Sequence, residues 1–477
     1  MILEVKHSRS EETLAAQLAA LGVPLDLRCG GGGRCGRCRV VLLSGQWLVD
    51  GRPLSVTEPI EVLACRTRLT GESGRVDVPD SSRAAEEGNT ALEWNAPPLP
   101  FSPESVIGID LGTTTVAAVK VCGGRVIGRA GAFNAQGRYG DNVVTRIDLA
   151  GSSPTGLETL RLAAVETVNR LLDELDTADC VRIAIAGNTV MSSLFHGIDP
   201  SSIGVMPFTP PCRVFPVRSA AECGLRAPAR VPVLTVPAIA GYVGGDLTAG
   251  LAEVGLRPGE MLVDIGTNCE ILFATPEGIF CTAAAAGPAF EGAGIACGSR
   301  AVPGAIDRWR APGEYSVLGG GAASGVCGSA MIDFLAAGRR LGFLNEFGRI
   351  QPAADSFELA PGVSIFERDI EQLLKAKAAV RAGIRTLAEH CGTGVEKLIL
   401  AGGFARHLDL GNAVAIDLLP ECRCEVVGNT SLAGAARLAV RPERMAELER
   451  LIDLPTDLPL NTLPQFEDNY IDALLLP

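Results

Sequence analysis

The apolar positions of the first 80 residues predict one helix among several short strands. Leu14, Leu18 and Leu21 recur at the spacing of a helix face, and Gly22 suits the end of that helix. Short apolar runs predict strands at residues 2–5, 40–43, 60–63 and 76–78. A strand, a helix, a glycine-rich loop and further strands match the layout of a β-grasp, ferredoxin-like domain, which we place at residues 1–80.

Residues 81–104 break this pattern and predict a flexible linker. The first half of the segment is polar, and the second half contains Pro97, Pro98, Pro100 and Pro103. A flexible chain of this length has an average end-to-end distance of about 27 Å and reaches ~80 Å when fully extended. We therefore expect the first domain to move between docking positions.

From Val106 onward, apolar strands alternate with helical stretches, a pattern typical of α/β domains with parallel strand pairing. One motif occurs twice, because an apolar strand ends in Asp110 and again in Asp264, and a Gly-Thr turn follows each aspartate. A duplicated, two-lobed fold explains this repeat. We place the first lobe at residues 105–257, the second lobe with a returning helix at 258–440 and a C-terminal extension at 441–477.

The composition narrows the functions that this chain can have. Of its 477 residues, 47% are hydrophobic, enough for a large core, and 56 are glycines, which suit the tight turns of nucleotide-binding proteins. A net charge of −13 argues against binding to nucleic acid. Neither a signal-peptide pattern after Met1 nor a run of about 20 apolar residues occurs, so we expect a cytoplasmic protein outside the membrane. In that compartment the 15 cysteines are expected to be thiols and metal ligands.

Four cysteines of the first domain have the spacing of an iron–sulfur site. Cys29, Cys35 and Cys38 follow the pattern C-x5-C-x2-C, and 26 residues separate Cys38 from Cys65. Plant-type [2Fe–2S] ferredoxins use C-x4-C-x2-C and a distant fourth cysteine. The glycines among residues 30–36 let the backbone wrap such a cluster. We predict a [2Fe–2S] cluster that transfers single electrons, and a structural zinc site with four thiolates is the alternative.

The repeated strand-and-turn segments are candidate phosphate-binding loops. An aspartate at a strand end can hold Mg²⁺ through water, and the turns offer backbone and hydroxyl donors to phosphate oxygens. A Gly-Gly turn after the apolar strand 398–400 lets the chain approach a nucleotide base or ribose. The candidate residues for this site are Asp110, Gly112, Thr113, Thr114, Asp264, Gly266, Thr267, Asn268, Gly402 and Gly403.

Together these motifs resemble those of the acetate kinase, sugar kinase, Hsp70 and actin superfamily of ATPases. The resemblance implies phosphate loops at residues 110–115 and 264–268 and an adenosine motif at Gly402 and Gly403. Sugar kinases of this superfamily carry a catalytic aspartate after a glycine in a segment similar to residues 241–246. Asp246 is therefore the candidate base or water-positioning carboxylate, and a helix N-cap is its alternative role. We group Asp246 with Asp110 and Asp264 as the catalytic candidates.

A ferredoxin-type cluster followed by this ATPase fold resembles the ATP-dependent reductive activators of corrinoid proteins. Gly287, in the family-like stretch 285–293, is a candidate cofactor-binding residue on this ground. Two departures stand out, since some members carry an extra domain after the linker and Cys269 stands where we expect glycine. The other similar stretches are residues 187–200, 241–250, 264–270, 325–330 and 400–404, so the resemblance covers nearly the whole chain after Val106.

The resemblance implies an enzyme that uses ATP to reduce an inactive Co(II) corrinoid to Co(I) for methyl transfer, as in O-demethylase systems. Its cofactors would be a [2Fe–2S] cluster, ATP and Mg²⁺. Its partners would be the corrinoid protein of a methyltransferase system and a low-potential electron donor, and a homodimer is compatible with this reading. Two alternatives stay open: an activator of a radical dehydratase or ring reductase, which carries a [4Fe–4S] cluster between subunits, and a small-molecule kinase with an attached redox domain.

Overall fold

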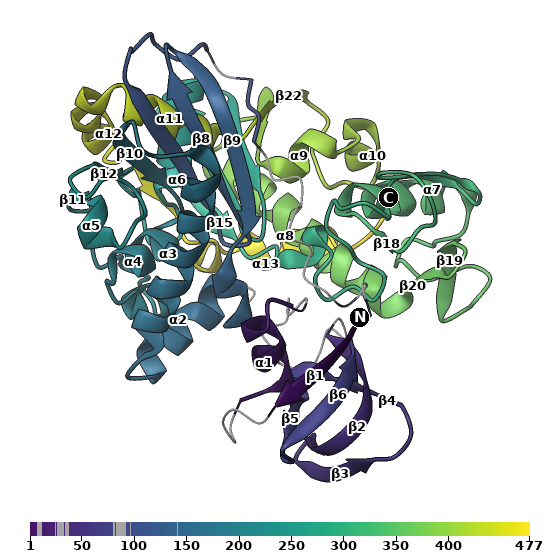
Figure 1. Cartoon of the computed structure of the whole chain (residues 1–477). Helices are drawn as coiled ribbons and strands as arrows, with labels where there is room; N and C mark the ends of the chain where they lie inside the picture. Colours follow the sequence, from purple (N-terminus) through teal and green to yellow (C-terminus); the bar gives the residue numbers. More distant parts are fainter. Residues whose placement is uncertain are drawn as a thin grey trace.

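The computed structural model describes residues 1–6, 12–23, 25, 33, 38–79, 82, 92–95, 97–140 and 142–477. It is an α/β protein with a small ferredoxin-like N-terminal domain and two larger lobes (Figure 1). In these ranges no helix has both the length and the apolar character needed to cross a membrane.

The N-terminal domain is a six-stranded sheet organised around one long strand, β2, which pairs with four others. Leu14 and Leu18 of helix α1 share one buried core with Trp47 of β2. Leu21 lies just beyond the helix and is 53% exposed, so the apolar helix face is shorter than the spacing predicts. The elements are β1 (Ile2–Lys6), α1 (Leu14–Ala20), β2 (Arg39–Val49), β3 (Arg52–Val56), β4 (Ile60–Leu63), η1 (Ala64–Arg66), β5 (Thr67–Leu69) and β6 (Ser73–Asp77).

The first lobe contains a six-stranded sheet in the order β11-β12-β10-β7-β8-β9. β7, β8 and β9 form an antiparallel meander, and β10 and β12 extend it with parallel pairing. The elements are β7 (Ser105–Leu111), β8 (Thr115–Cys122), β9 (Arg125–Phe133), η3 (Ala135–Arg138), α2 (Val143–Ser152), α3 (Gly156–Leu175), β10 (Cys180–Ala186), α4 (Thr189–His196), η4 (Ser201–Gly204), β11 (Arg218–Ser219), α5 (Ala220–Cys223), β12 (Pro232–Thr235) and α6 (Gly245–Val254).

The second lobe repeats this arrangement in the sheet β22-β21-β13-β14-β15-β23. β13, β14 and β15 form the meander, and β21 and β22 add the parallel strands, which confirms the predicted duplication. The elements are β13 (Glu260–Ile265), β14 (Cys269–Thr275), β15 (Gly278–Ala284), η5 (Pro288–Glu291), β16 (Ala305–Ala311), β17 (Glu314–Val317), β18 (Gly325–Val326), α7 (Gly328–Leu341), β19 (Ser356–Ala360), β20 (Val363–Phe366), α8 (Glu367–His390), β21 (Lys397–Ala401), α9 (Gly403–His407), α10 (Leu410–Ala415) and β22 (Arg423–Gly428).

Helix α11 (Thr430–Val440) leaves the second lobe and packs on β7 and α6 of the first lobe. Figure 1 shows α11 beside the strands of the first lobe and far from α7 of the second lobe. The close packing requires glycine in the strand, because a Cβ atom at Gly108 would lie 2.5 Å from Cα of Ala436. The returning helix therefore joins the two lobes behind the turns that carry the predicted phosphate loops.

The last part of the expected linker is held against the second lobe, which limits the freedom predicted for residues 81–104. Trp94 forms a β-bridge with Gly428 at the end of β22, and the Asn95 amide donates to the Val427 carbonyl at 2.8 Å. Arg437 donates to the carbonyls of Pro97 and Pro98. The exposed edge of β22 supplies unpaired backbone groups, and this segment satisfies some of them.

Helix α12 (Met445–Leu451) packs on α6 of the first lobe, and the segment that follows it extends the second lobe. β23 adds parallel to β15, and α13 packs on α8. Lys377 of α8 is fully buried and donates to the carbonyls of Ala473 and Leu475. The elements are η6 (Pro442–Arg444), α12 (Met445–Leu451), β23 (Pro455–Asp457), η7 (Leu460–Thr462) and α13 (Gln465–Asp472).

Candidate functional site

A cavity of about 880 Å³ lies between the lobes, and the two candidate phosphate loops line it. The first loop is the turn between β7 and β8, and the second is the turn between β13 and β14. Because the two sheets repeat one topology, these turns occupy equivalent places and face each other. The cavity wall includes the loop candidates from both lobes, Gly402, Gly403 and Asp246. Gly287 is not part of this wall in the described chain, and at φ 73° it turns the backbone into η5.

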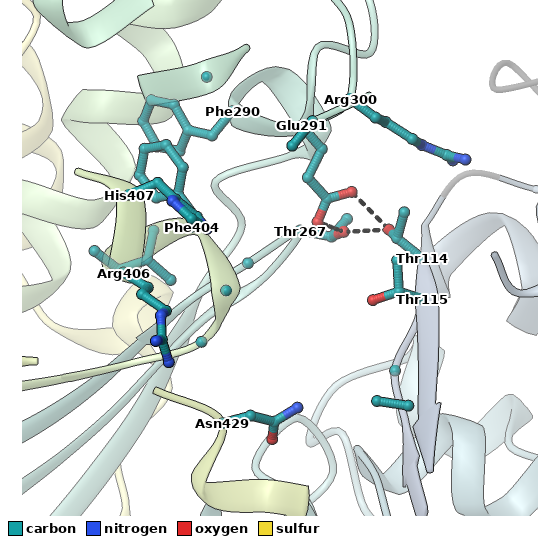
Figure 2. A pocket seen from close by; sticks show the side chains of 18 of the residues that line it. Thr114, Thr115, Thr267, Phe290, Glu291, Arg300, Phe404, Arg406, His407 and Asn429 are labelled. Atoms are coloured by element: carbon teal, nitrogen blue, oxygen red, sulfur yellow. Dashed lines mark hydrogen bonds between the residues drawn. The ribbon is translucent and has the colours of Figure 1, made fainter. Parts of the chain in front are cut away.

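The two loops are bridged by a glutamate that the loop motifs do not contain. Oγ1 of Thr114 donates to Glu291 at 2.6 Å, and Oγ1 of Thr267 donates to the other carboxylate oxygen at 2.8 Å. The two hydroxyl oxygens are 2.9 Å apart (Figure 2). The neighbouring hydroxyl of Thr113 points elsewhere, since it accepts from the side-chain amide of Asn188 at 2.9 Å. Thr114 and Thr267 are thus the loop hydroxyls that meet across the cavity.

Two side chains from the start of α11 hold Asp110. Asn429 donates to one carboxylate oxygen at 2.8 Å, and Ser431 donates to the other at 2.7 Å. Burial raises the pKa of Asp110, and the bonds from Ser431 and Asn429 oppose that rise. Asn429 also caps α11 by accepting from the Leu432 amide at 2.7 Å. The returning helix therefore determines how the first aspartate is presented to the cavity.

Asp246, Asp264 and Glu270 add three more carboxyl groups close to Asp110. Burial, together with the charges of Asp246 and Asp110, raises the pKa of Asp264 to about 7. Burial also raises the pKa of Asp246 to about 7, with a smaller contribution from Asp110 and an opposing hydrogen bond from the Leu247 amide. Burial, and then the charges of Asp246 and Asp264, also raise the pKa of Glu270 well above its usual value. Mutual repulsion among these carboxyl groups favours the binding of a cation close to them.

The described residues contain no group of three His, Cys, Asp or Glu side chains placed to ligate one metal ion directly. Mg²⁺ usually keeps several waters and is held by one or two carboxylates together with substrate phosphates. A carboxylate pair such as Asp110 and Asp264, facing a cavity large enough to admit phosphates, fits this mode of binding. The donor set therefore suits a hydrated Mg²⁺ rather than a dehydrated metal site.

Beside the phosphate loops, the cavity wall is formed by the Gly-Gly turn and an aromatic pair. A Cβ atom at Gly402 would lie 2.5 Å from Oδ1 of Asp264, and its φ of 89° also favours glycine. Phe404 stacks on Phe290 with ring centroids 4.9 Å apart. Arg406 of the same short helix pairs with Glu93 of the docked segment. The Gly-Gly turn is therefore adjacent to the phosphate loops, as a nucleotide site requires.

Two arginines of the cavity wall connect other parts of the chain. The Arg300 guanidinium, from the second lobe, stacks 3.7 Å from the ring centroid of Phe133 in the first lobe. Arg308 lies 3.8 Å from the buried carboxylate of Asp333. Arg300 thus links the two lobes at the cavity wall, whereas Arg308 pairs with a carboxylate outside that wall.

Four residues that contact the phosphate loops are not among the candidates predicted from the loop motifs, namely Asn188, Glu291, Asn429 and Ser431. One signal for two of them is present in the sequence, because Gly-Asn-Thr follows an apolar strand at residues 187–189 and again at 428–430. Both asparagines cap helices, α4 and α11, and both also reach the first phosphate loop. Glu291 lies in the family-like stretch 285–293, whereas Ser431 carries no comparable local signal.

Two of the four candidate cluster ligands lie in the described chain. Cys38 and Cys65 are both buried, and the Ala64 amide donates to the Cys38 carbonyl at 2.9 Å, which ties the two segments together. Gly33 has a φ of 69°, a backbone conformation that favours glycine, and a Cβ atom there would require the Arg66 side chain to shift. Cys29 and Cys35 lie outside the described residues. The two described thiols fit a ligand set drawn from one loop and one distant segment.

Three family models match consecutive parts of the chain. The 2Fe-2S iron-sulfur cluster binding domain matches residues 4–70, which supports a cluster domain. The RACo middle region matches residues 106–258, and the C-terminal domain of RACo, the ASKHA domain, matches residues 259–477. The latter two together span both lobes and the C-terminal extension.

Two curated proteins and one solved structure are similar over much of the chain. The corrinoid activation enzyme RamQ of Eubacterium limosum is 26% identical over 98% of this chain and 97% of its own. The [Co(II) methylated amine-specific corrinoid protein] reductase of Methanosarcina barkeri is 29% identical over 65% of each chain. The solved structure of a reductive activator for corrinoid, iron-sulfur protein is 27% identical, with a TM-score of 0.72 over 99% of this chain and 98% of that one.

Proposed function

The chain belongs to the family of ATP-dependent reductive activators of corrinoid proteins, and we propose that it uses ATP to return the cobalt of a corrinoid protein from Co(II) to Co(I). The observation that carries this function is the union, in one chain, of a [2Fe–2S] domain with a two-lobed cavity that both phosphate loops line. The similarity extends over nearly the full length of an activator, and this favours corrinoid reduction over the kinase alternative.

The energetic problem explains why such a reductase needs ATP. Plant-type clusters have potentials near about −400 mV, and each shortfall of ~59 mV costs tenfold in a one-electron equilibrium. Nucleotide can offset this cost only by binding differently to two states of the protein. The cavity between the lobes is the place where such a difference arises, because both lobes contribute donors to one site.

The predicted residues with the clearest contacts in the cavity each have a proposed role. Thr114 and Thr267 donate to phosphate oxygens, and Asp110 and Asp264 hold water around Mg²⁺, which when bound neutralises phosphate charge. Asp246, in the first turn of α6, positions the attacking water. Gly402 and Gly403 give the nucleotide room beside Asp264. In the N-terminal domain Cys29, Cys35, Cys38 and Cys65 hold the cluster, which supplies single electrons.

The finer assignments follow from the same proposal. The partner is the corrinoid protein of a methyltransferase system, the electron source is a low-potential donor, and a homodimer is the oligomeric state to test. The domain division is 1–80, 81–104, 105–257, 258–440 and 441–477. Within it, residues 92–95 and 97–98 of the segment 81–104 are docked, so the proposed tether is shorter than the whole segment.

The test is reduction of a corrinoid protein under anaerobic conditions. The cluster-loaded protein, a strong reductant and Mg²⁺ are mixed with a candidate Co(II) corrinoid protein, and the Co(I) absorbance is followed with ATP or with ADP. We expect Co(I) to accumulate with ATP and not with ADP, and the Asp246→Ala variant to hydrolyse ATP at least a hundredfold more slowly. Equal reduction with both nucleotides, or none with any corrinoid protein, would contradict the proposal. Transfer of phosphate to a metabolite would favour a kinase instead.

A further inference from the structure

The Glu291 carboxylate is the single acidic group that contacts hydroxyls from both phosphate loops in the described chain. Thr114 belongs to the first lobe, and Thr267 and Glu291 belong to the second. One carboxylate oxygen accepts from each threonine, at 2.6 and 2.8 Å. Figure 2 shows the glutamate side chain reaching down from η5 to the point where the two hydroxyls meet. The contact therefore joins the lobes at the position where their loops are closest.

This contact uses the donors that a phosphate would need. Each threonine hydroxyl has one proton and can give it to one acceptor at a time. A carboxylate and a phosphate are both anions, so they also repel each other when they share a site. The same two hydroxyls cannot serve Glu291 and a phosphate group together.

The geometry indicates which phosphate competes with the glutamate. The carboxylate takes hydrogen bonds from loops on opposite sides of the cavity. The terminal phosphate of either nucleotide has three unesterified oxygens, but that of ATP lies one phosphoryl group further from the nucleoside, and a group at that distance can accept from both loops at once. ADP lacks that group, and its phosphates can occupy the cavity without displacing the glutamate from both hydroxyls.

We propose that Glu291 is a specificity-determining residue that occupies the place of the terminal phosphate of ATP, so that ATP must displace it and ADP need not. The inference rests on the proposed binding of ATP between the two loops. Glu291 therefore lowers the affinity for ATP relative to the affinity for ADP. It also makes the contact between the lobes depend on whether the terminal phosphate is bound.

The test compares the affinities of a non-hydrolysable ATP analogue and ADP, each with Mg²⁺, by calorimetry on the full-length protein. In Glu291→Ala both hydroxyls are released, and we expect the analogue to bind at least tenfold tighter while the ADP affinity stays within twofold. Glu291→Gln keeps the shape and removes the charge, so it should give a smaller change in the same direction. Glu222→Ala is the matched control, because this carboxylate also accepts from a hydroxyl, that of Ser219 at 2.6 Å, but lies outside the cavity wall, so its loss should leave the affinity ratio unchanged.

The outcomes separate this inference from the proposed function. Weaker binding of the analogue in Glu291→Ala, or equal changes for both nucleotides, would overturn the competition and assign Glu291 to the bound nucleotide or to folding. An unchanged ratio in both Glu291 variants would overturn it as well. If wild-type protein binds ADP and the analogue but only the ratio fails to respond, the proposed function stands. If neither nucleotide binds to the wild-type protein, both fail.

Discussion

The side-chain amide of Asn429 donates a 2.8 Å hydrogen bond to the carboxylate of Asp110, although 319 residues separate them along the chain. The backbone N–H of Asn429 also donates to the carbonyl of Glu93 at 3.0 Å. One residue at the start of α11 thus contacts the first phosphate loop and the docked end of the tether. The position of the tether and the presentation of Asp110 are coupled through this residue.

Ser431→Ala should weaken the hold on Asp110 and lower both stability and ATP turnover. The variant removes a buried hydrogen bond to a carboxylate, a bond that contributes about 2 kcal/mol to the free energy of unfolding. A displaced Asp110 should reduce the rate of ATP hydrolysis by roughly tenfold or more. Chemical denaturation and a phosphate-release assay measure the two effects.

Ser193→Ala is the control for that variant. Ser193 is equally buried, and its hydroxyl donates to the Thr189 carbonyl of its own helix at 2.7 Å. We expect a loss of about 1 kcal/mol and an unchanged rate of hydrolysis. Equal loss of ATP turnover in both variants would show that Ser431 acts only through stability.

Gly428→Ala should release the docked end of the tether. A Cβ atom there would lie 2.6 Å from the Glu93 carbonyl oxygen and 3.0 Å from Cα of Trp94. Trp47 and Trp309 are buried, so the half-buried Trp94 is the tryptophan that an added quencher reaches. We expect acrylamide quenching of tryptophan fluorescence to increase in this variant.

The control for this change is Gly392→Ala, which places the same strain in the backbone without the clash. Gly392 has a φ of 59°, and nothing lies within 4 Å of the added Cβ atom. Both variants should lose about 1 kcal/mol from the unfavourable backbone conformation, but only Gly428→Ala should change the quenching. Unchanged quenching in Gly428→Ala would mean that the tether end docks without the β22 edge.

The pH dependence of stability should reflect the buried His196. Burial, and to a lesser degree the charge of Arg218, lowers its pKa from 6.5 to about 4. Between these values the unfolded chain binds the proton and the folded protein does not, so stability is full above pH 6.5 and falls as the pH approaches 4. The loss reaches about 3 kcal/mol at most.

The measurement is the thermal midpoint at several pH values for wild type and His196→Gln. The variant has no proton to gain at this position, so its midpoint should fall less steeply between pH 6.5 and 4. His390→Gln, at an exposed helix end, should keep the wild-type slope. Identical slopes in all three proteins would assign the acid sensitivity to other groups.

Cys65→Ser should remove or strongly weaken the iron–sulfur cluster and leave nucleotide binding intact. Cys65 is buried in η1 next to the Cys38 segment, whereas the ATP cavity is lined by other parts of the chain. Iron content and visible absorbance should fall in this variant and stay at wild-type levels in Cys212→Ser, a half-buried thiol of the first lobe. Purified wild-type protein with stoichiometric zinc and no iron would contradict the cluster assignment.

The sequence by itself determined the elements whose signals are local. A strand that ends in aspartate before a Gly-Thr turn specifies a hairpin loop within a few residues, and it does so in each lobe at Asp110 and Asp264. The cysteine spacing likewise indicated a cluster domain, and the repeat indicated two lobes. Hydrophobic periodicity and turn residues act over short distances, so a single chain carries these signals without its partners.

Only the tertiary structure decided which side chains serve those loops. Glu291 reaches Thr114 across 177 residues, and the docked Glu93 reaches Asn429 through a backbone hydrogen bond that any residue types can form. Contacts of this kind depend on how two sheets and the returning helix pack, and no local pattern records that packing. The same reason explains why residues 92–95 were predicted as linker, because the β22 edge that holds Trp94 and Asn95 is formed more than 300 residues later.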